Sequence, residues 1–244
     1  TPSLYSAWIT TIQPTENIEP EKDKLVINII KYISYSINIE FLETILLPFL
    51  LKNPRFVNDN INEILVQTLN DPSLFFIKEF LKYPGIDINY CKNDDTSILV
   101  KAIQSKNVDA VELLLKNPNI DINDDYGYSH FPPFIHACIE GSYQKVFRLF
   151  FQNPRFDIYK TDSRNNYTCV KICALKDNFF GLKYIFDQYP DFKEDVDFTL
   201  IFICLTKNYF LTVKTLLMFY FKKEKSKVEF INMLKNRLSN CNNL

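Results

Sequence analysis

A proline-marked segment recurs along this chain at nearly fixed intervals. It reads LLLKNPNIDIN at Leu113–Asn123 and returns in recognisable copies before and after that point. A period of about 20 to 50 residues is typical of a solenoid, in which each unit packs mainly against its neighbours. The marker prolines are 30, 34, 36 and 36 residues apart: Pro54, Pro84, Pro118, Pro154 and Pro190.

The residues of the segment explain why it repeats. The apolar run Leu113–Leu115 predicts the end of a helix that is buried almost all round. Pro118 predicts where that helix stops, because proline lacks an N–H group and pushes the preceding Asn117 toward extended backbone angles. Ile120–Asn123 then alternates apolar and polar residues, which is typical of a short extended arm with one face on the core. One unit is therefore predicted to be helix, stop and arm.

The start of each unit resembles the TPLHxA opening of the ankyrin repeat. It reads SILVKA at Ser97–Ala102, PFIHAC at Pro133–Cys138 and TCVKICA at Thr168–Ala174, and His136 matches the histidine of the family. The segments that follow, such as IEGSYQKVFRLFF at Ile139–Phe151, resemble the second helix of the repeat and the turn before it. The resemblance implies divergent ankyrin repeats of a protist type. It covers residues 25–221.

The resemblance also implies where the turn between the two helices of a repeat lies. The family places a glycine there, and Gly141 matches it, with Lys106 and Asn178 at that position in other repeats. After the second helix, an Asn-Pro or Tyr-Pro stop replaces the family's glycine and makes the exit one residue longer.

The fold class expected is all-α, a helical solenoid of about six stacked ankyrin-like pairs joined by short extended loops. Residues 1–24 are expected to be a tail or cap, residues 25–225 the repeat array, and residues 226–244 a capping helix with a frayed end. In that last part, Val228–Leu238 places apolar residues on one side of a helix. The predicted helices span 25–35, 41–52, 62–69, 73–82, 97–105, 109–116, 134–140, 143–152, 169–176, 181–188, 198–207 and 210–221.

Composition argues against several classes of function. The net charge of −1 supplies no field that would attract nucleic acid or acidic lipid, and four scattered glycines cannot form a glycine-rich phosphate loop. No apolar run reaches the roughly 18 to 20 residues of a membrane span. The abundance of Asn, Lys, Ile and Phe indicates an AT-rich genome. We expect a cytoplasmic protein, with a cytoskeletal location as the alternative.

The cysteines are expected to be small buried residues in a reducing compartment, without catalytic, cofactor or metal roles. His136 and Cys138 are two residues apart on a helix and cannot face one another. Cys169 and Cys173 share a face, but two thiols do not make a zinc site. A basic run in residues 222–227 is expected to be a solvated turn, the alternative being an acidic partner or nucleic acid. The six cysteines are Cys91, Cys138, Cys169, Cys173, Cys204 and Cys241.

The polar tips between the arms are the candidate partner surface, because the resemblance implies that such tips line the binding edge. They span residues 90–96, 124–132 and 160–167. Clustered aromatic side chains in the middle tip exceed what a solvated turn requires, and aromatic residues often anchor interfaces. The candidate residues are Tyr90, Lys92, Asp94, Asp124, Asp125, Tyr126, Tyr128, His130, Phe131, Lys160, Arg164 and Tyr167.

The function expected is that of a non-catalytic scaffold that binds partner proteins through its concave face and tips, either alone or within a larger assembly. One alternative is the substrate-recruiting part of a larger enzyme. Another is a structural component of a cytoskeletal assembly, microtubular or axonemal. The sequence does not identify the partner.

Overall fold

The computed structural model describes the chain mainly from residue 96 onward. The described residues form α-helices joined by turns, with no β-strand among them, which confirms the predicted all-α class. They are residues 47–53, 55–58, 60, 64, 69, 74–82, 87–89, 96–125, 131–141, 144–190, 192 and 198–221, with residues 28 and 232.

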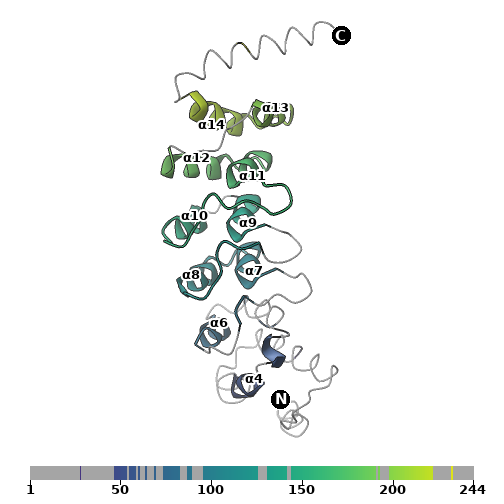
Figure 1. Cartoon of the computed structure of the whole chain (residues 1–244), viewed down its shortest axis with the longest axis vertical. Helices are drawn as coiled ribbons and strands as arrows, with labels where there is room; N and C mark the ends of the chain where they lie inside the picture. The colour runs from purple at the N-terminus through teal and green to yellow at the C-terminus, as the bar shows by residue number, and fades with distance from the viewer. Residues whose placement is uncertain are drawn as a thin grey trace, which may run out of the picture. The chain divides into compact units, whose positions relative to one another are not determined.

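The chain divides into two compact units, Thr1–Asp121 with Tyr126–Ser129 and Ile122–Asp125 with His130–Leu244. The described helices of the first unit are labelled in Figure 1, and within it α7 packs against α8. Their bounds are α4 Leu47–Lys52, α6 Phe75–Phe80, α7 Ile98–Gln104 and α8 Val108–Lys116.

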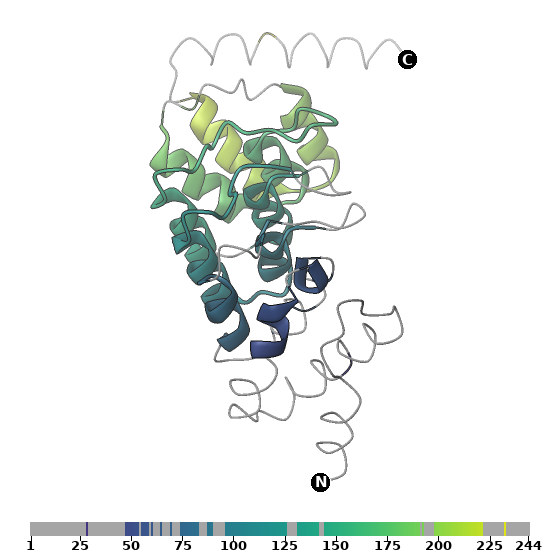
Figure 2. The same cartoon turned by 60° about the horizontal axis from the view of Figure 1, so that its bottom comes forward.

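The described residues of the second unit form three helix pairs, α9 with α10, α11 with α12, and α13 with α14. The first helices form one row, because α11 packs against both α9 and α13, and the second helices form another, because α12 packs against both α10 and α14. Figures 1 and 2 show the two rows from different sides. The bounds are α9 Pro133–Glu140, α10 Gln144–Phe151, α11 Cys169–Leu175, α12 Phe179–Gln188, α13 Phe198–Thr206 and α14 Phe210–Phe221.

Side-chain caps fix where several helices begin. Ser97 Oγ accepts a hydrogen bond from the Val100 N–H at 3.4 Å, and Thr168 Oγ1 accepts one from the Lys171 N–H at 3.3 Å. Such caps satisfy N–H groups that have no partner within the helix. These two residues open the segments that resemble TPLHxA.

Asparagine caps start two of the second helices. Asn107 Oδ1 accepts from the Ala110 N–H and Asn178 Oδ1 from the Gly181 N–H, both at 2.9 Å. The cap at Asn178 makes α12 begin at Phe179, two residues before the predicted start at Gly181.

The proline-marked stop behaves as predicted. Asn117 has φ −75° and ψ 126°, which are extended angles, directly after the last residue of α8. Its Oδ1 accepts the Asn119 N–H at 2.8 Å, and Asn153 Oδ1 accepts the Arg155 N–H at 3.0 Å in the next copy. The asparagine before the proline thus stabilises the turn that follows the helix.

The apolar run at the end of α8 faces the core, although less completely than predicted. Leu114 is fully buried and Leu115 is 5% exposed, whereas Leu113 is only half-buried. The arm that follows keeps the predicted alternation, with Ile120 and Ile122 buried and the polar residues between and after them half-buried. The arm itself consists of turns and bends.

The turns between paired helices correct one position. Three of these turns contain a residue with left-handed backbone angles. These residues are Lys106 with φ 63°, Asp177 with φ 56° and Asn208 with φ 61°. Gly141, with φ 69°, occupies the turn before α10. The prediction that Asn178 holds the glycine-like position is therefore wrong by one residue, because Asn178 is the cap of α12.

Several predictions lie outside the described residues. They concern the tail at 1–24, the first predicted helix at 25–35 and the capping helix within 226–244. Among the helices that the structure does describe, none has both the length and the apolar character needed to cross a membrane.

The burial of Leu114 supports a stability prediction. Replacing Leu114 with alanine should lower the free energy of unfolding by about 2 to 5 kcal/mol, because apolar contact is lost and a cavity remains. Denaturant melts monitored by circular dichroism measure this change. Glu112→Ala on the same helix is the control, and a loss below about 1 kcal/mol for Leu114→Ala would contradict the assigned core.

Candidate functional site

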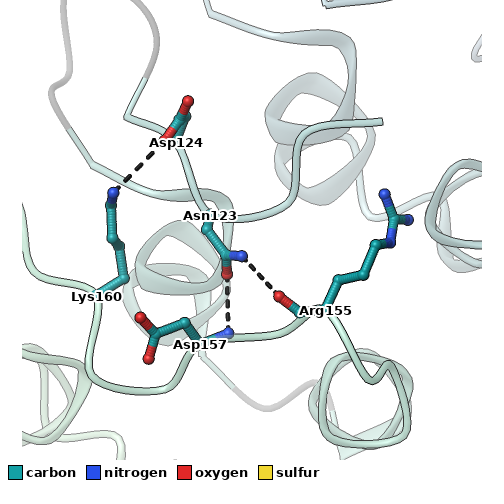
Figure 3. Close-up of polar contacts among 5 residues, drawn as sticks. All are labelled: Asn123, Asp124, Arg155, Asp157 and Lys160. Atoms are coloured by element: carbon teal, nitrogen blue, oxygen red, sulfur yellow. Dashed lines mark hydrogen bonds and ion pairs between the residues drawn. The ribbon is translucent and has the colours of Figure 1, made fainter. Parts of the chain in front are cut away.

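The arms carry a repeated asparagine contact that ties each one to the next. Asn123 Oδ1 accepts a hydrogen bond from the Asp157 N–H at 2.9 Å, while Asn123 Nδ2 donates to the Arg155 carbonyl at 2.7 Å. Figure 3 shows this single amide reaching two backbone groups of the following arm. An amide suits this position because it has both a donor and an acceptor.

The same contact occurs one copy earlier. Asn89 Oδ1 accepts from the Asp121 N–H at 2.9 Å, and Asn89 Nδ2 donates to the Asn119 carbonyl at 2.7 Å. One copy before that, Asn58 Oδ1 accepts from the Asp87 N–H at 3.0 Å. The backbone of these arms is thus held by side chains where no strand pairing is present in the described residues.

The next arm has an aromatic contact at the matching position. Tyr159 lies where Asn89 and Asn123 lie in their arms, five residues after the marker proline. Its ring stacks on that of Phe192, with centroids 5.1 Å apart and planes at 15°. Phe192 is fully buried, whereas Tyr159 remains 49% exposed. This arm therefore presents a large exposed aromatic side chain that the buried Phe192 ring holds in place.

A buried carboxylate shapes the tip that follows Tyr159. Asp162 is fully buried, and its Oδ1 accepts the N–H groups of Arg164 at 3.0 Å and Asn165 at 2.7 Å. Its Oδ2 accepts the Tyr167 N–H at 2.6 Å. These contacts give both buried carboxyl oxygens hydrogen-bond partners and fix the backbone of residues 162–167. The Arg164 side chain is exposed on this ordered turn.

Other predicted site residues lie beside this tip. Lys160 Nζ is 3.5 Å from Asp124 Oδ1, with the two side chains 42% and 46% exposed. Because both side chains are so exposed, this ion pair contributes only about 0 to 1 kcal/mol to the stability of the fold. Both charged groups remain in contact with solvent. The Tyr167 ring is half-buried beneath Lys171, whose Nζ lies 4.2 Å from the ring centroid.

The remaining predicted site residues are either half-buried or outside the described residues. Asp125 and Phe131 are half-buried, and the Phe131 ring meets the His136 ring edge-on at a centroid distance of 5.8 Å. The candidates outside the described residues are Tyr90, Lys92, Asp94, Tyr126, Tyr128 and His130.

The described thiols are buried core groups. Cys138, Cys169, Cys173 and Cys204 all have no exposed surface. Burial raises the pKa of Cys138, as does its contact with the Cys173 thiol, and burial together with Asp177 raises the pKa of Cys204 to about 11. A thiol that stays protonated is a poor nucleophile and a poor metal ligand.

Metal ligands do not gather in the described part of the chain. Among those residues, no group of three or more His, Cys, Asp or Glu side chains is placed to hold an ion. His136, the matched histidine of the TPLHxA resemblance, is 5% exposed, and burial lowers its pKa to about 4. It is therefore neutral at physiological pH.

Several residues that shape this surface were not predicted from the sequence as site residues. Asn89 and Asn123 end identical IDIN segments 34 residues apart, and this repetition is the signal that could have identified them. Asp162 and Tyr159 have no residue of the same type at the matching positions of the copies that end at Asn89 and Asn123, so no repeated pattern indicates their roles.

No protein-family model and no curated protein matches the sequence of this chain. The side chains on the described arms and tip are hydrogen-bonding, charged and aromatic.

The asparagine contact leads to a prediction. Asn123→Ala should lower the free energy of unfolding by about 1 to 2 kcal/mol, because two backbone groups lose a partner at a partly hydrated site. Asn123→Asp should cost less, since it keeps the acceptor. Denaturant melts measure both, and Asn119→Ala is the matched control because only backbone atoms of Asn119 join these contacts. Equal losses for Asn123→Ala and Asn119→Ala would contradict the structural role of the amide.

His136 should make folding sensitive to acid. Its pKa is about 4 when folded against 6.5 when unfolded, so between these values the unfolded chain binds the extra proton. Stability should therefore fall as pH drops from about 6.5 to 4, by up to about 3 kcal/mol from this group. Unfolding free energies across that pH range, compared between the natural chain and His136→Gln, isolate the effect. Parallel curves for the two proteins would show that His136 does not contribute.

Proposed function

We propose that this protein is a non-catalytic binding module of the ankyrin-repeat type, which holds a partner protein along its arms and tips. The proline-marked period runs through the sequence of both units, and the described helices from α7 onward occur as pairs that follow it. Ser97 and Thr168 cap first helices at the position of the family's threonine, and His136 is buried at the position of its histidine. These features support the family resemblance.

The observation that carries the proposal is that side-chain contacts fix the non-helical backbone from which exposed side chains project. Asn123 holds Arg155 and Asp157 through their backbone groups, and both side chains are exposed. Tyr159 is fixed by Phe192 beneath it, and Arg164 by the turn around Asp162. A surface ordered before binding loses little conformational entropy when a partner docks, which favours affinity.

The composition of this surface favours a protein partner. Arg155, Lys160 and Arg164 are interspersed with Asp124 and Asp157, so neither sign of charge dominates. A nucleic-acid surface would need a basic stripe, and the net charge of −1 provides no such excess overall. Tyrosine and arginine are the residue types most often found at the centres of protein interfaces. Tyr159 is thus the proposed anchor.

A matched pair of aromatic residues tests the proposal. Tyr159 on the arm and Phe180 on α12 are 49% and 48% exposed, so alanine replaces a ring of similar accessibility at each. Tyr159→Ala should weaken partner binding about tenfold or more, which corresponds to about 1.4 kcal/mol, whereas Phe180→Ala should leave it unchanged. The partner is first captured from native extract and identified by mass spectrometry, and dissociation constants then follow from calorimetry.

Thermal melts of the two variants provide the control for folding. Loss of the ring stacked on Phe192 should cost about 0.5 to 1.5 kcal/mol of stability, too little to unfold the chain. If Phe180→Ala weakens binding and Tyr159→Ala does not, the partner occupies the helices and the proposal fails.

A further inference from the structure

The second helices of the second unit change in character along their row. Within this unit α12 packs against both α10 and α14, and Figure 1 shows the three helices in order. The exposed side chains of α10 include Lys145 and Arg148. Those of α14 include Phe210, Leu211 and Met218, which are 67%, 53% and 61% exposed. Large apolar side chains gathered on an exposed helix face indicate an interaction surface.

The three helices share one pattern of burial, so their positions can be matched. In each of them the third, fourth and seventh residues are buried, whereas the second and fifth are exposed. The exposed second residues are Lys145, Phe180 and Leu211. The exposed fifth residues are Arg148, Lys183 and Lys214. Residues three apart lie on the same side of a helix, so these six side chains, with Met218 one turn further on, form an outward face.

The outward face is basic as well as apolar. The charged residues of α10, α12 and α14 are Lys145, Arg148, Lys183 and Lys214, with Asp187 as the one acidic residue. The net charge of the whole chain is −1, so this positive excess is local. In the sequence, α14 is followed directly by KKEKSK at residues 222–227, which adds four lysines and one glutamate.

We propose that the outward face docks on the surface of a membrane rich in anionic lipid. Basic side chains attract acidic headgroups, and each one near such a surface strengthens binding by about fivefold. Apolar side chains such as Phe180, Leu211 and Met218 can enter the boundary between headgroups and acyl chains. The outward face carries both kinds of side chain in neighbouring positions, as an interfacial surface requires.

The charges of the outward face disfavour a second copy of the chain as its occupant. In a symmetric dimer through this face, basic side chains of one copy would meet those of the other, and such like-charge contacts are unfavourable. The residue types also vary along the row, because α10 presents two basic residues where α14 presents one apolar and one basic. A layer of lipid headgroups tolerates this variation, since its molecules rearrange around each side chain.

Flotation of the full chain with lipid vesicles tests the role of charge. The chain should bind vesicles made of equal parts of phosphatidylcholine and phosphatidylserine, and not vesicles of phosphatidylcholine alone. Lys183→Glu with Lys214→Glu should weaken this binding by about tenfold or more. The matched control is Lys52→Glu with Lys106→Glu, which makes the same charge change at exposed positions of the first unit and should leave binding unchanged. Equal losses for the two variants would overturn the proposal.

The apolar side chains are tested in the same assay. Leu211→Ala with Met218→Ala should weaken binding to the mixed vesicles by about tenfold or more, because less apolar surface enters the interface. Both side chains are more than half exposed, so the helical circular dichroism signal should be retained. The matched control is Phe202→Ala with Leu205→Ala on α13, where the side chains are 49% and 39% exposed. Binding that falls equally in both variants would contradict the assigned face.

Photocrosslinking keeps the test decisive even if a double variant fails to fold. A benzophenone amino acid at Leu211 should crosslink to lipid in the mixed vesicles, whereas the same group at Phe202 should not. Crosslinks from Leu211 to a second copy of the chain, or to an acidic protein of added native extract, with none to lipid, would assign the face to that partner and overturn the proposal. Absence of binding to the mixed vesicles would overturn it as well.

Discussion

The arms of this protein depend on one side-chain amide that bonds the backbone of the following arm. Backbone N–H and C=O groups outside helices need partners, and strand pairing does not supply them in the described residues. Asn89 and Asn123 supply them instead, each with one donor and one acceptor. This contact fixes the backbone that carries the exposed side chains of the following arm. The order of the proposed binding surface therefore depends on residues that need not touch a partner.

The features that the sequence predicted well are those that local chemistry determines. Asn117 takes extended angles because proline follows it, and Leu114 is buried because it lies on an apolar helix face. Helix bounds follow from the same local signals, and α14 matches its predicted span in full. The all-α class follows from these elements without knowledge of their packing.

The features that the sequence did not predict depend on contacts between distant residues. The role of Asn123 requires that Arg155 and Asp157 lie beside it, which no pattern within one segment specifies. The family resemblance implies Asn178 at the left-handed turn position, whereas the structure has Asp177 there. Both residue types tolerate that conformation, and the capping contact of Asn178 with the Gly181 N–H distinguishes the two positions. The role of Tyr159 could not be predicted for a related reason, since its contact with Phe192 has no counterpart in the other described arms.

Tyr159 replaces the asparagine of the other arms, and this replacement affects where repeat units can be added to the chain or removed from it. A unit that both offers and receives the amide contact is interchangeable with its neighbours, so duplicating or deleting it leaves every junction chemically matched. The junction between Tyr159 and Phe192 is made instead by stacked rings, which join no other pair of arms among the described residues. Adding or removing a unit before Tyr159 would therefore keep the amide contacts matched, whereas a change between Tyr159 and Phe192 would separate the two stacked rings.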